Sequence, residues 1–177
     1  LAMETNLNQM KLKTGKLSKN DWLKLNKIIK ILAKFPLFID DTPALSVFEL
    51  RAKCRRLKAQ HDIQIIIIDY LQLMTAGGNG GNRQEEISTI SRSIKEIAKE
   101  LNVPILALSQ LSRSVESRGG DNRPKLSDLM ESGAIEQDAD IVLFLYRESY
   151  YKREEEEKAT EVTEVLISKH RNGATGS

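Results

Sequence analysis

The sequence predicts an α/β fold with a largely parallel β-sheet that helices cover on both faces. Unbroken aliphatic segments, such as the isoleucine run at 65–68, alternate with segments whose apolar residues recur at helical spacing. Strands that are apolar on both faces are typical of parallel sheets buried between helices. The chain is therefore expected to form a sheet whose central strand contains the isoleucine run.

The composition is that of an ordinary globular chain. Its 177 residues are enough for one domain with its own core, and 40% of them are hydrophobic and 29% charged. The net charge of +2 means that any basic surface must be local. The single cysteine, Cys54, excludes an internal disulfide and fits a reducing compartment. No apolar run approaches the ~20 residues of a membrane span, so no membrane association is expected.

Residues 1–62 are predicted to hold helices and one short strand. The first long helix follows Ser18, which forms an approximate capping box with Asp21 and precedes apolar residues at helical spacing. The strand is predicted at 37–40, after the proline that ends this helix. Ser46 is suited to cap the next helix.

Residues 63–177 are predicted to form the main part of the sheet. Alternating strands, helices and polar loops are expected here. After the isoleucine strand come a helix at 83–101 and strands at 103–109, 139–147 and 163–169, with an acidic tract at 148–160 between the last two.

Asp69 follows the isoleucine strand directly. Ligands of open parallel sheets bind beyond the carboxyl ends of strands. An apolar run ending in aspartate is the pattern of a Walker B strand, whose carboxylate holds the water shell of a nucleotide-bound Mg²⁺. A carboxylate here could instead cap the next turn or pair with a nearby base. Asp69 is the candidate metal residue.

Three other polar residues follow predicted strands. Gln110 lies just beyond the strand at 103–109, where a neutral amide can bond a γ-phosphate or an attacking water; the alternative is a helix-terminal residue without a ligand. Lys169 and Arg171 end the last strand and are spaced to point the same way. Two such cations can form a phosphate clamp or arginine finger, or a solvated strand edge.

Several long stretches, in a consistent order, resemble the DnaB-type replicative DNA helicase family and cover nearly the whole chain. They are residues 65–74, 82–118, 123–147 and 167–176. The resemblance implies a RecA-like fold of the P-loop NTPase class, incomplete at both ends, in which 1–177 is part of the motor domain. It also implies a six-membered ring around single-stranded DNA, with ATP and Mg²⁺ bound between subunits, 5′-to-3′ travel, and primase and loader partners.

The resemblance assigns a role to each candidate residue. Asp69 would position Mg²⁺ and water, Gln110 would sense the γ-phosphate, and Lys169 and Arg171 would reach the neighbouring subunit's ATP. The inner loop that contacts the DNA backbone is matched by three residues: Glu131, Ser132 and Gly133.

The chain departs from the family pattern at two positions. Met130 stands where the family loop has an arginine, and loss of that cation is expected to weaken phosphate binding. Arg118, Arg123 or Lys125 are candidates to compensate, and Arg123 and Lys125 are taken as DNA-binding residues. His170 replaces a glutamine and is expected to be a tolerated polar exchange.

The sequence contains no phosphate-binding loop of the form Gly-x-x-x-x-Gly-Lys-Ser/Thr. The family's catalytic glutamate is also expected upstream of Leu1. The chain is therefore expected to be part of a longer protein: alone it would not hydrolyse ATP, whereas the intact parent would. A bacterial cytoplasm or a plastid stroma is the expected location.

Two other functions fit part of the pattern. The first is a recombinase or clock-type ATPase of the RecA superfamily, which residues 127–140 disfavour because they resemble the helicase group specifically. The second is a non-catalytic interaction module within a ring or loader complex. The missing phosphate loop favours that module, while the joint presence of Asp69, Gln110, Lys169 and Arg171 disfavours it.

Overall fold

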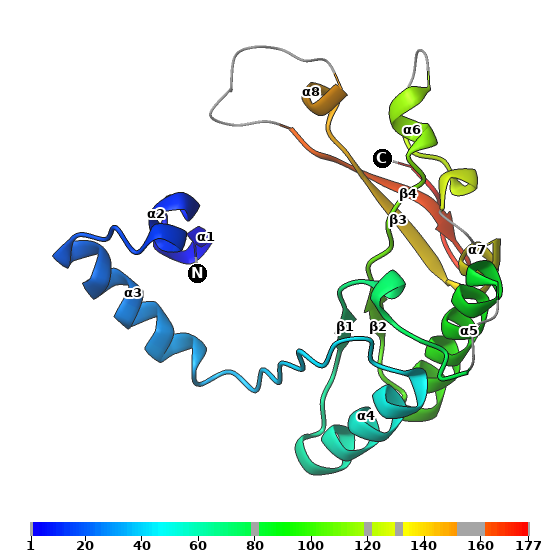
Figure 1. Cartoon of the computed structure of the whole chain (residues 1–177), viewed down its shortest axis with the longest axis horizontal. Coiled ribbons are helices and arrows are strands. Elements are labelled where there is room, and N and C mark those ends of the chain that lie inside the picture. Colours follow the sequence, from blue (N-terminus) through cyan, green and yellow to red (C-terminus); the bar gives the residue numbers. More distant parts are fainter. Residues whose placement is uncertain (1, 79–81, 119–121, 130–132, 152–161, 177) are drawn as a thin grey trace. The chain divides into compact units, whose positions relative to one another are not determined.

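The structure is a computed structural model that describes residues 2–78, 82–118, 122–129, 133–151 and 162–176. It divides into two compact units, Leu1–Asp41 and Thr42–Ser177. No described helix is both long and apolar enough to cross a membrane. The elements are α1 (Ala2–Thr5), α2 (Gln9–Thr14), α3 (Lys19–Leu32), α4 (Val47–His61), β1 (Ile66–Ile68), η1 (Leu71–Leu73), α5 (Arg83–Leu101), β2 (Ile105–Ala107), α6 (Ser114–Ser117), η2 (Leu126–Asp128), α7 (Gly133–Asp138), β3 (Ile141–Tyr146), α8 (Glu148–Tyr151) and β4 (Glu164–His170). Figure 1 labels the α-helices and the β-strands.

The first unit is helical, and its longest helix is α3. The predicted capping box is present: the Asp21 N–H donates to Ser18 Oγ at 3.2 Å, and the Ser18 N–H donates to a carboxylate oxygen of Asp21 at 3.0 Å. These two bonds satisfy backbone donors that a helix start leaves unpaired. The prediction for this helix start is confirmed.

The strand predicted at 37–40 is wrong. None of the strand pairs or isolated bridges among the described residues includes this segment. A strand needs a neighbour to form its ladder of backbone hydrogen bonds, and apolar content alone does not supply one. Leu37 and Ile39 accordingly leave 71% and 83% of their surfaces exposed.

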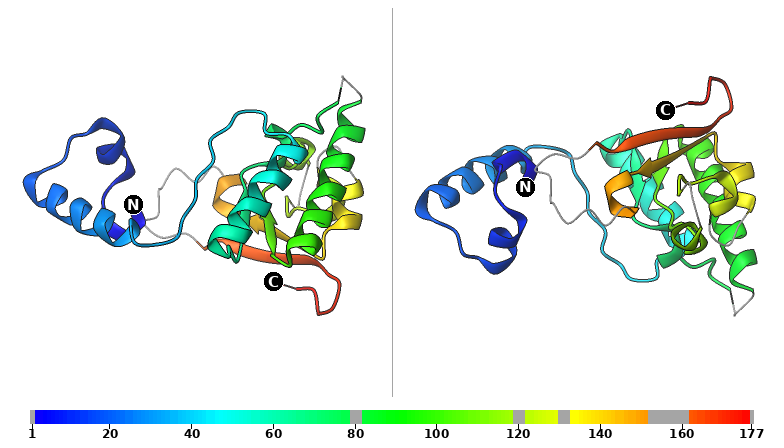
Figure 2. Two further views of the ribbon diagram at one scale, coloured as in Figure 1. Left: turned by 90° about the horizontal axis from the view of Figure 1, so that it is seen from below. Right: turned by 90° about the horizontal axis from the view of Figure 1, so that it is seen from above.

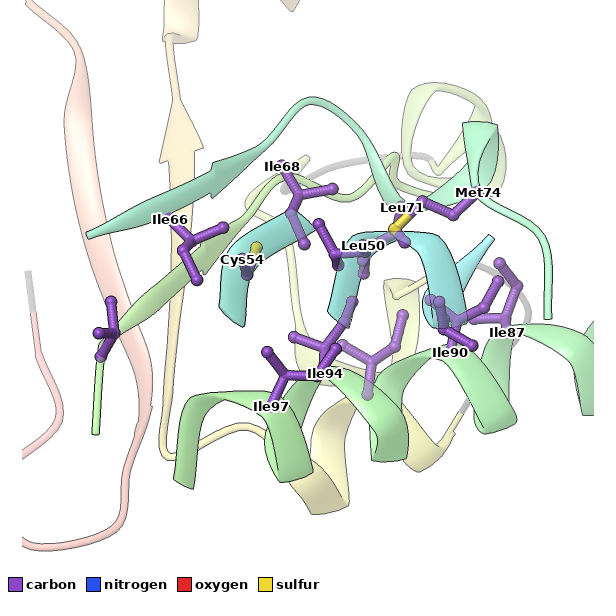
Figure 3. Close-up of a cluster of buried hydrophobic side chains, with 13 residues drawn as sticks. Leu50, Cys54, Ile66, Ile68, Leu71, Met74, Ile87, Ile90, Ile94 and Ile97 are labelled. Atoms are coloured by element: carbon purple, nitrogen blue, oxygen red, sulfur yellow. The ribbon is translucent and has the colours of Figure 1, made fainter. Parts of the chain in front are cut away.

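The core of the second unit lies where α4 and α5 meet β1 and β2. The predicted cap of α4 is confirmed, since Ser46 and Glu49 form a capping box. Helix α5 has the predicted bounds, and its buried face points toward α4 and the strands (Figure 3). That face consists of Ile87, Ile90, Ile94 and Ile97. Helix α5 also contacts α7, so it joins the core to the later part of the chain (Figure 2).

Strands β1 and β2 form a parallel pair, as the sequence predicts, but helices cover only one of its faces within the described residues. Ile66 and Ile68 point into the core. Ile67 and its partner Leu106, on the other face of the pair, are 61% and 47% exposed. The α/β class is confirmed, and within the described residues α4 and α5 pack on the face that bears Ile66 and Ile68. Sequence shows that both faces are apolar, but not what covers each of them.

Strands β3 and β4 form a separate antiparallel pair. The prediction of a mostly parallel sheet therefore holds for β1 and β2 but not for this pair. In β3 buried and exposed residues alternate, as expected of a sheet with one solvated face. The register shifts between Val142, opposite Lys169, and Leu143, opposite Ile167. Ser168 is thus an extra residue in β4, and its bulge lies directly before Lys169.

Candidate functional site

Asp69 lies at the carboxyl end of β1, and the backbone on both sides of it is fixed. The Leu108 N–H donates to the Ile68 carbonyl at 2.9 Å, and the Leu71 N–H donates to the Leu108 carbonyl at 3.0 Å. The peptide bond between Asp69 and Tyr70 is cis. The Asp69 side chain is exposed and makes no hydrogen bond or ion pair within the described residues. Its position is therefore set by the strand, and its carboxylate is available to a ligand.

Gln110 lies beyond β2 and thus on the same edge of the sheet as Asp69. Its backbone N–H donates to Gln72 Oε1 at 3.3 Å, and Gln72 Nε2 donates to Ser109 Oγ at 3.1 Å. Gln72 therefore ties the segment after β1 to the segment after β2. Gln72 lies inside the 65–74 motif, but nothing in the sequence pattern distinguishes it from its neighbours.

The segment after Asp69 is also attached to the start of α5. Arg83 donates to the Gln72 carbonyl at 2.6 Å and pairs with Glu86, which also accepts the Ala76 N–H at 3.2 Å. The hydrogen bond from Arg83, followed by that from Ala76, lowers the pKa of Glu86 although burial opposes the shift. The Glu86 carboxylate therefore stays ionised at neutral pH and holds this segment on the core helix.

Lys169 and Arg171 reach the C-terminal end of α7. Lys169 Nζ donates to the Glu136 carbonyl and, at 3.2 Å, to the Gln137 carbonyl. Arg171 donates to the same Gln137 carbonyl at 3.3 Å. The expectation that both side chains point the same way agrees with these contacts, and cations at the last carbonyls of a helix are favourable. The bulge at Ser168 lies directly before Lys169, and a bulge changes the direction of the side chain next to it.

The two groups of candidate residues form separate halves. Every side-chain hydrogen bond or ion pair of Lys169 and Arg171 within the described residues is to α7 or Asp140, and none is to Asp69 or Gln110. One half presents a carboxylate and an amide, and the other presents two cations. No contact among the described residues joins the two groups, which suits a site whose halves come from two copies of the chain.

The structure places only part of the predicted DNA site. Glu131 and Ser132, like Met130, lie outside the described residues, and Gly133 begins α7. Arg123 forms a two-bond ion pair with Glu164 at 2.7 and 3.4 Å, and its guanidinium lies 4.9 Å from the centre of the Tyr146 ring. The Lys125 side chain is exposed. Lys125 is thus the more available of the two predicted phosphate contacts.

Arg118, the third candidate cation, is bound to a buried carboxylate. It pairs with Asp128, whose side chain is 4% exposed and which also accepts the Lys125 N–H at 2.7 Å. Burial by itself would raise the pKa of Asp128, but the bonds from Lys125 and Arg118 together lower it. Arg118 therefore has a structural partner and is a poor substitute for the cation missing at position 130.

Replacing Arg118 with alanine is expected to lower the free energy of unfolding by about 1–3 kcal/mol at pH 7, because a buried charged acceptor loses its partner. The folded-state pKa of Asp128 lies below its unfolded value of about 3.9, so this stabilisation is complete above that pH. It is lost as pH falls through the folded pKa. Denaturant unfolding of both proteins at pH 7 and in steps below pH 4 should show the difference shrink, whereas Arg56→Ala, which removes an exposed guanidinium, should change little at either pH.

His170 constrains the turn that follows β4. A Cβ atom on Gly173 would lie 2.1 Å from two atoms of the His170 ring. The ring therefore occupies the space that a side chain at 173 would need, and the two residues fit each other. Glycine is therefore required at position 173, and the sequence pattern did not indicate this requirement.

Comparison with known proteins identifies relatives over the whole chain. A family model described as the DnaB-like helicase C-terminal domain matches residues 1–177. The replicative DNA helicase DnaB of Geobacillus stearothermophilus is 52% identical over 178 aligned residues, which cover 100% of this chain and 38% of that protein. The chain thus spans well under half the length of this relative.

Two solved structures have the same fold. One, described as an ATPase domain, superimposes with a TM-score of 0.89 at 43% identity, covering 98% of this chain and 61% of that one. A DnaB-like replicative helicase, described with its interactions with primase, superimposes with a TM-score of 0.88 at 42% identity, covering 98% and 42% of the two chains. The RecA-like α/β fold expected from the sequence is confirmed.

Proposed function

We infer, because the chain belongs to the family of DnaB-like helicase C-terminal domains, that it is part of the motor of a ring-forming replicative DNA helicase. The intact protein would couple ATP hydrolysis to 5′-to-3′ movement on single-stranded DNA and to unwinding of the duplex. Its partners would be five further copies of itself, single-stranded DNA, primase and a helicase loader. It would act in a bacterial cytoplasm or in a plastid stroma.

The observation that carries this proposal is the division of the candidate residues into two halves. Asp69 and Gln110 follow paired parallel strands, and Lys169 and Arg171 lie together at the end of α7 without contacting them. A ring in which each subunit faces the next the same way brings one half of each subunit to the other half of its neighbour. Completing a site in this way makes hydrolysis depend on assembly.

The residues at the first half fit a magnesium nucleotide. Mg²⁺ keeps several waters and usually takes only one or two protein carboxylates in addition to phosphate oxygens. Asp69 supplies one exposed carboxylate at a position fixed by strand pairing. Gln110 supplies an exposed amide on the same edge, which can donate to a γ-phosphate. Bound Mg²⁺ would neutralise charge that develops on the phosphates.

The DNA contacts would be made by the inner loop with help from nearby cations. Glu131, Ser132 and Gly133 are proposed to bind the backbone of the strand, which suits a motor that must hold phosphates without reading bases. Lys125, which is exposed, and Arg123, which is shared with Glu164, are the proposed basic contacts.

Replacing Lys125 with alanine in the full-length protein is expected to weaken binding of single-stranded DNA equally for all sequences. The slope of log affinity against log salt concentration should fall by about 0.7, because one fewer counterion is released. Binding of a labelled oligonucleotide between low and moderate salt measures this slope. Lys58→Ala, which removes a lysine paired with Asp62 on the far end of α4, is the control. An unchanged slope in the Lys125 variant would remove this residue from the DNA site.

The 177-residue chain alone is proposed to be inactive, because its sequence has no phosphate-binding loop. The same absence is what supports the alternative, a non-catalytic module within a ring or a loader complex. The two functions differ in one assay: the full-length protein, given ATP and Mg²⁺, should separate a fork that has a 5′ single-stranded tail and leave a substrate with only a 3′ tail intact. Failure to open either substrate, in a protein that still forms rings, would favour the module.

A further inference from the structure

Arg171 is held by one acidic residue from two directions. Its guanidinium pairs with Asp140 at 3.2 Å, and its backbone N–H donates to the Asp140 carbonyl at 2.8 Å. The remaining guanidinium contact is the bond to the Gln137 carbonyl at 3.3 Å. Asp140 lies between the end of α7 and the start of β3, so it connects the arginine to both elements.

Asp140 is itself attached to the core helix. Lys95, whose side chain is 21% exposed on α5, donates to the second carboxylate oxygen of Asp140. The Lys95 bond lowers the pKa of Asp140 against the effect of burial, and Arg171 adds to the shift. Lys95 follows the buried Ile94 on the helix that forms most of the core. A continuous set of contacts therefore runs from α5 through Asp140 to the guanidinium of Arg171.

The charges around Asp140 leave Arg171 able to bind another anion. Lys95 and Arg171 both contact this one carboxylate, and Lys169 lies beside Arg171 on the same helix end. The cations therefore outnumber the carboxylate that holds them. The Arg171 side chain is also 49% exposed, so an incoming phosphate can reach it while Asp140 keeps its direction.

We propose that Asp140 is a positioning residue for Arg171. Asp140, which is itself bound by Lys95, holds the guanidinium at the place where it contacts the triphosphate bound to the adjoining subunit. This inference rests on the proposed function. A cation aimed in advance stabilises charge in the transition state without reorganisation at the moment of reaction. Asp140 touches neither nucleotide nor DNA in this arrangement and acts only through the arginine.

The test is Asp140→Asn in the full-length helicase, which removes the charge and keeps the shape. The kcat for ATP should fall about tenfold and KM should stay within about twofold, because the arginine contributes mainly to the transition state. Lys95→Met, which keeps the apolar stem, should give a smaller fall in kcat. The matched control is Asp62→Asn, an exposed Lys58-paired aspartate at the end of α4, which should leave kcat unchanged.

The decisive measurement repeats Asp140→Asn in an Arg171→Ala background, under single-turnover conditions. If Asp140 acts through Arg171, the double variant should be no slower than Arg171→Ala alone. An equal loss in both backgrounds, or an unchanged kcat in the single variant, would overturn the proposal while leaving the proposed function intact. A normal kcat for Arg171→Ala itself would instead contradict the role of the arginine on which both depend.

Discussion

Replacing Asp69 with asparagine in the full-length protein is expected to lower the rate of ATP hydrolysis by about a hundredfold to a thousandfold. Asparagine keeps the shape but loses the charge that holds the water shell of Mg²⁺, so charge on the phosphates is stabilised less in the transition state. Steady-state phosphate release at saturating ATP, and at a Mg²⁺ concentration that just saturates the unmodified protein, measures the effect. Raising the Mg²⁺ concentration should restore part of the lost activity if the defect is in metal binding.

Folding should be unaffected by this change, because the Asp69 side chain has no partner among the described residues. Thermal unfolding without nucleotide should therefore give the same midpoint for the variant and the parent. Asp62→Asn, which neutralises an exposed aspartate at the end of α4, should hydrolyse ATP normally. Normal hydrolysis by the Asp69 variant would show that this carboxylate does not serve the nucleotide.

Replacing Arg171 with alanine is expected to reduce ATP hydrolysis by about a thousandfold or more, the effect typical of removing an arginine finger. The loss should appear in kcat, since the guanidinium acts on charge that develops during transfer of the phosphoryl group. Nucleotide affinity, measured by binding of a fluorescent ATP analogue, should change much less.

The same variant should remain folded. The ion pair of Arg171 with Asp140 joins two side chains that are about half exposed, and such pairs contribute at most about 1 kcal/mol. Arg56→Ala removes another exposed guanidinium, on α4, and should keep full activity. A large loss of stability in Arg171→Ala, or a rise in KM with unchanged kcat, would contradict a role in the transition state.

The sequence predicted those elements whose signals are local. Helix α5 has the predicted bounds because four isoleucines recur at helical spacing between a capping Asn82 and Asn102, which ends the helix at φ +50°. The capping box at Ser18 and the N-cap at Ser46 were equally visible, since both signals lie within a few residues of the helix start.

Elements that depend on a distant partner were predicted less well. Residues 37–40 have the apolar character of a strand, but no described strand lies beside them. On β1, Ile67 faces away from the core and stays exposed among the described residues. Both features depend on which segment lies alongside, and no local pattern contains that information.

For the candidate site, the sequence identified which residue types follow each strand, but not their partners. Its expectation that Lys169 and Arg171 point the same way agrees with their shared contact at the Gln137 carbonyl, although Arg171 lies just beyond the end of β4. It could not show that both bind carbonyls of α7, or that Arg123 pairs with Glu164, 41 positions away. Those contacts arise from folding, and they change how available each cation is to DNA or ATP.

The central claim is that Asp69 of one subunit and Arg171 of the next serve the same nucleotide. The most direct measurement mixes full-length Asp69→Asn and Arg171→Ala subunits in equal amounts, allows them to exchange between rings, and follows ATP hydrolysis. A random mixture places an intact Asp69 beside an intact Arg171 of the neighbour at about a quarter of the interfaces. The mixture should therefore hydrolyse ATP far faster than either variant alone, up to about a quarter of the unmodified rate. Activity no higher than the average of the two variants, in rings shown to contain both subunits, would contradict a site shared between subunits.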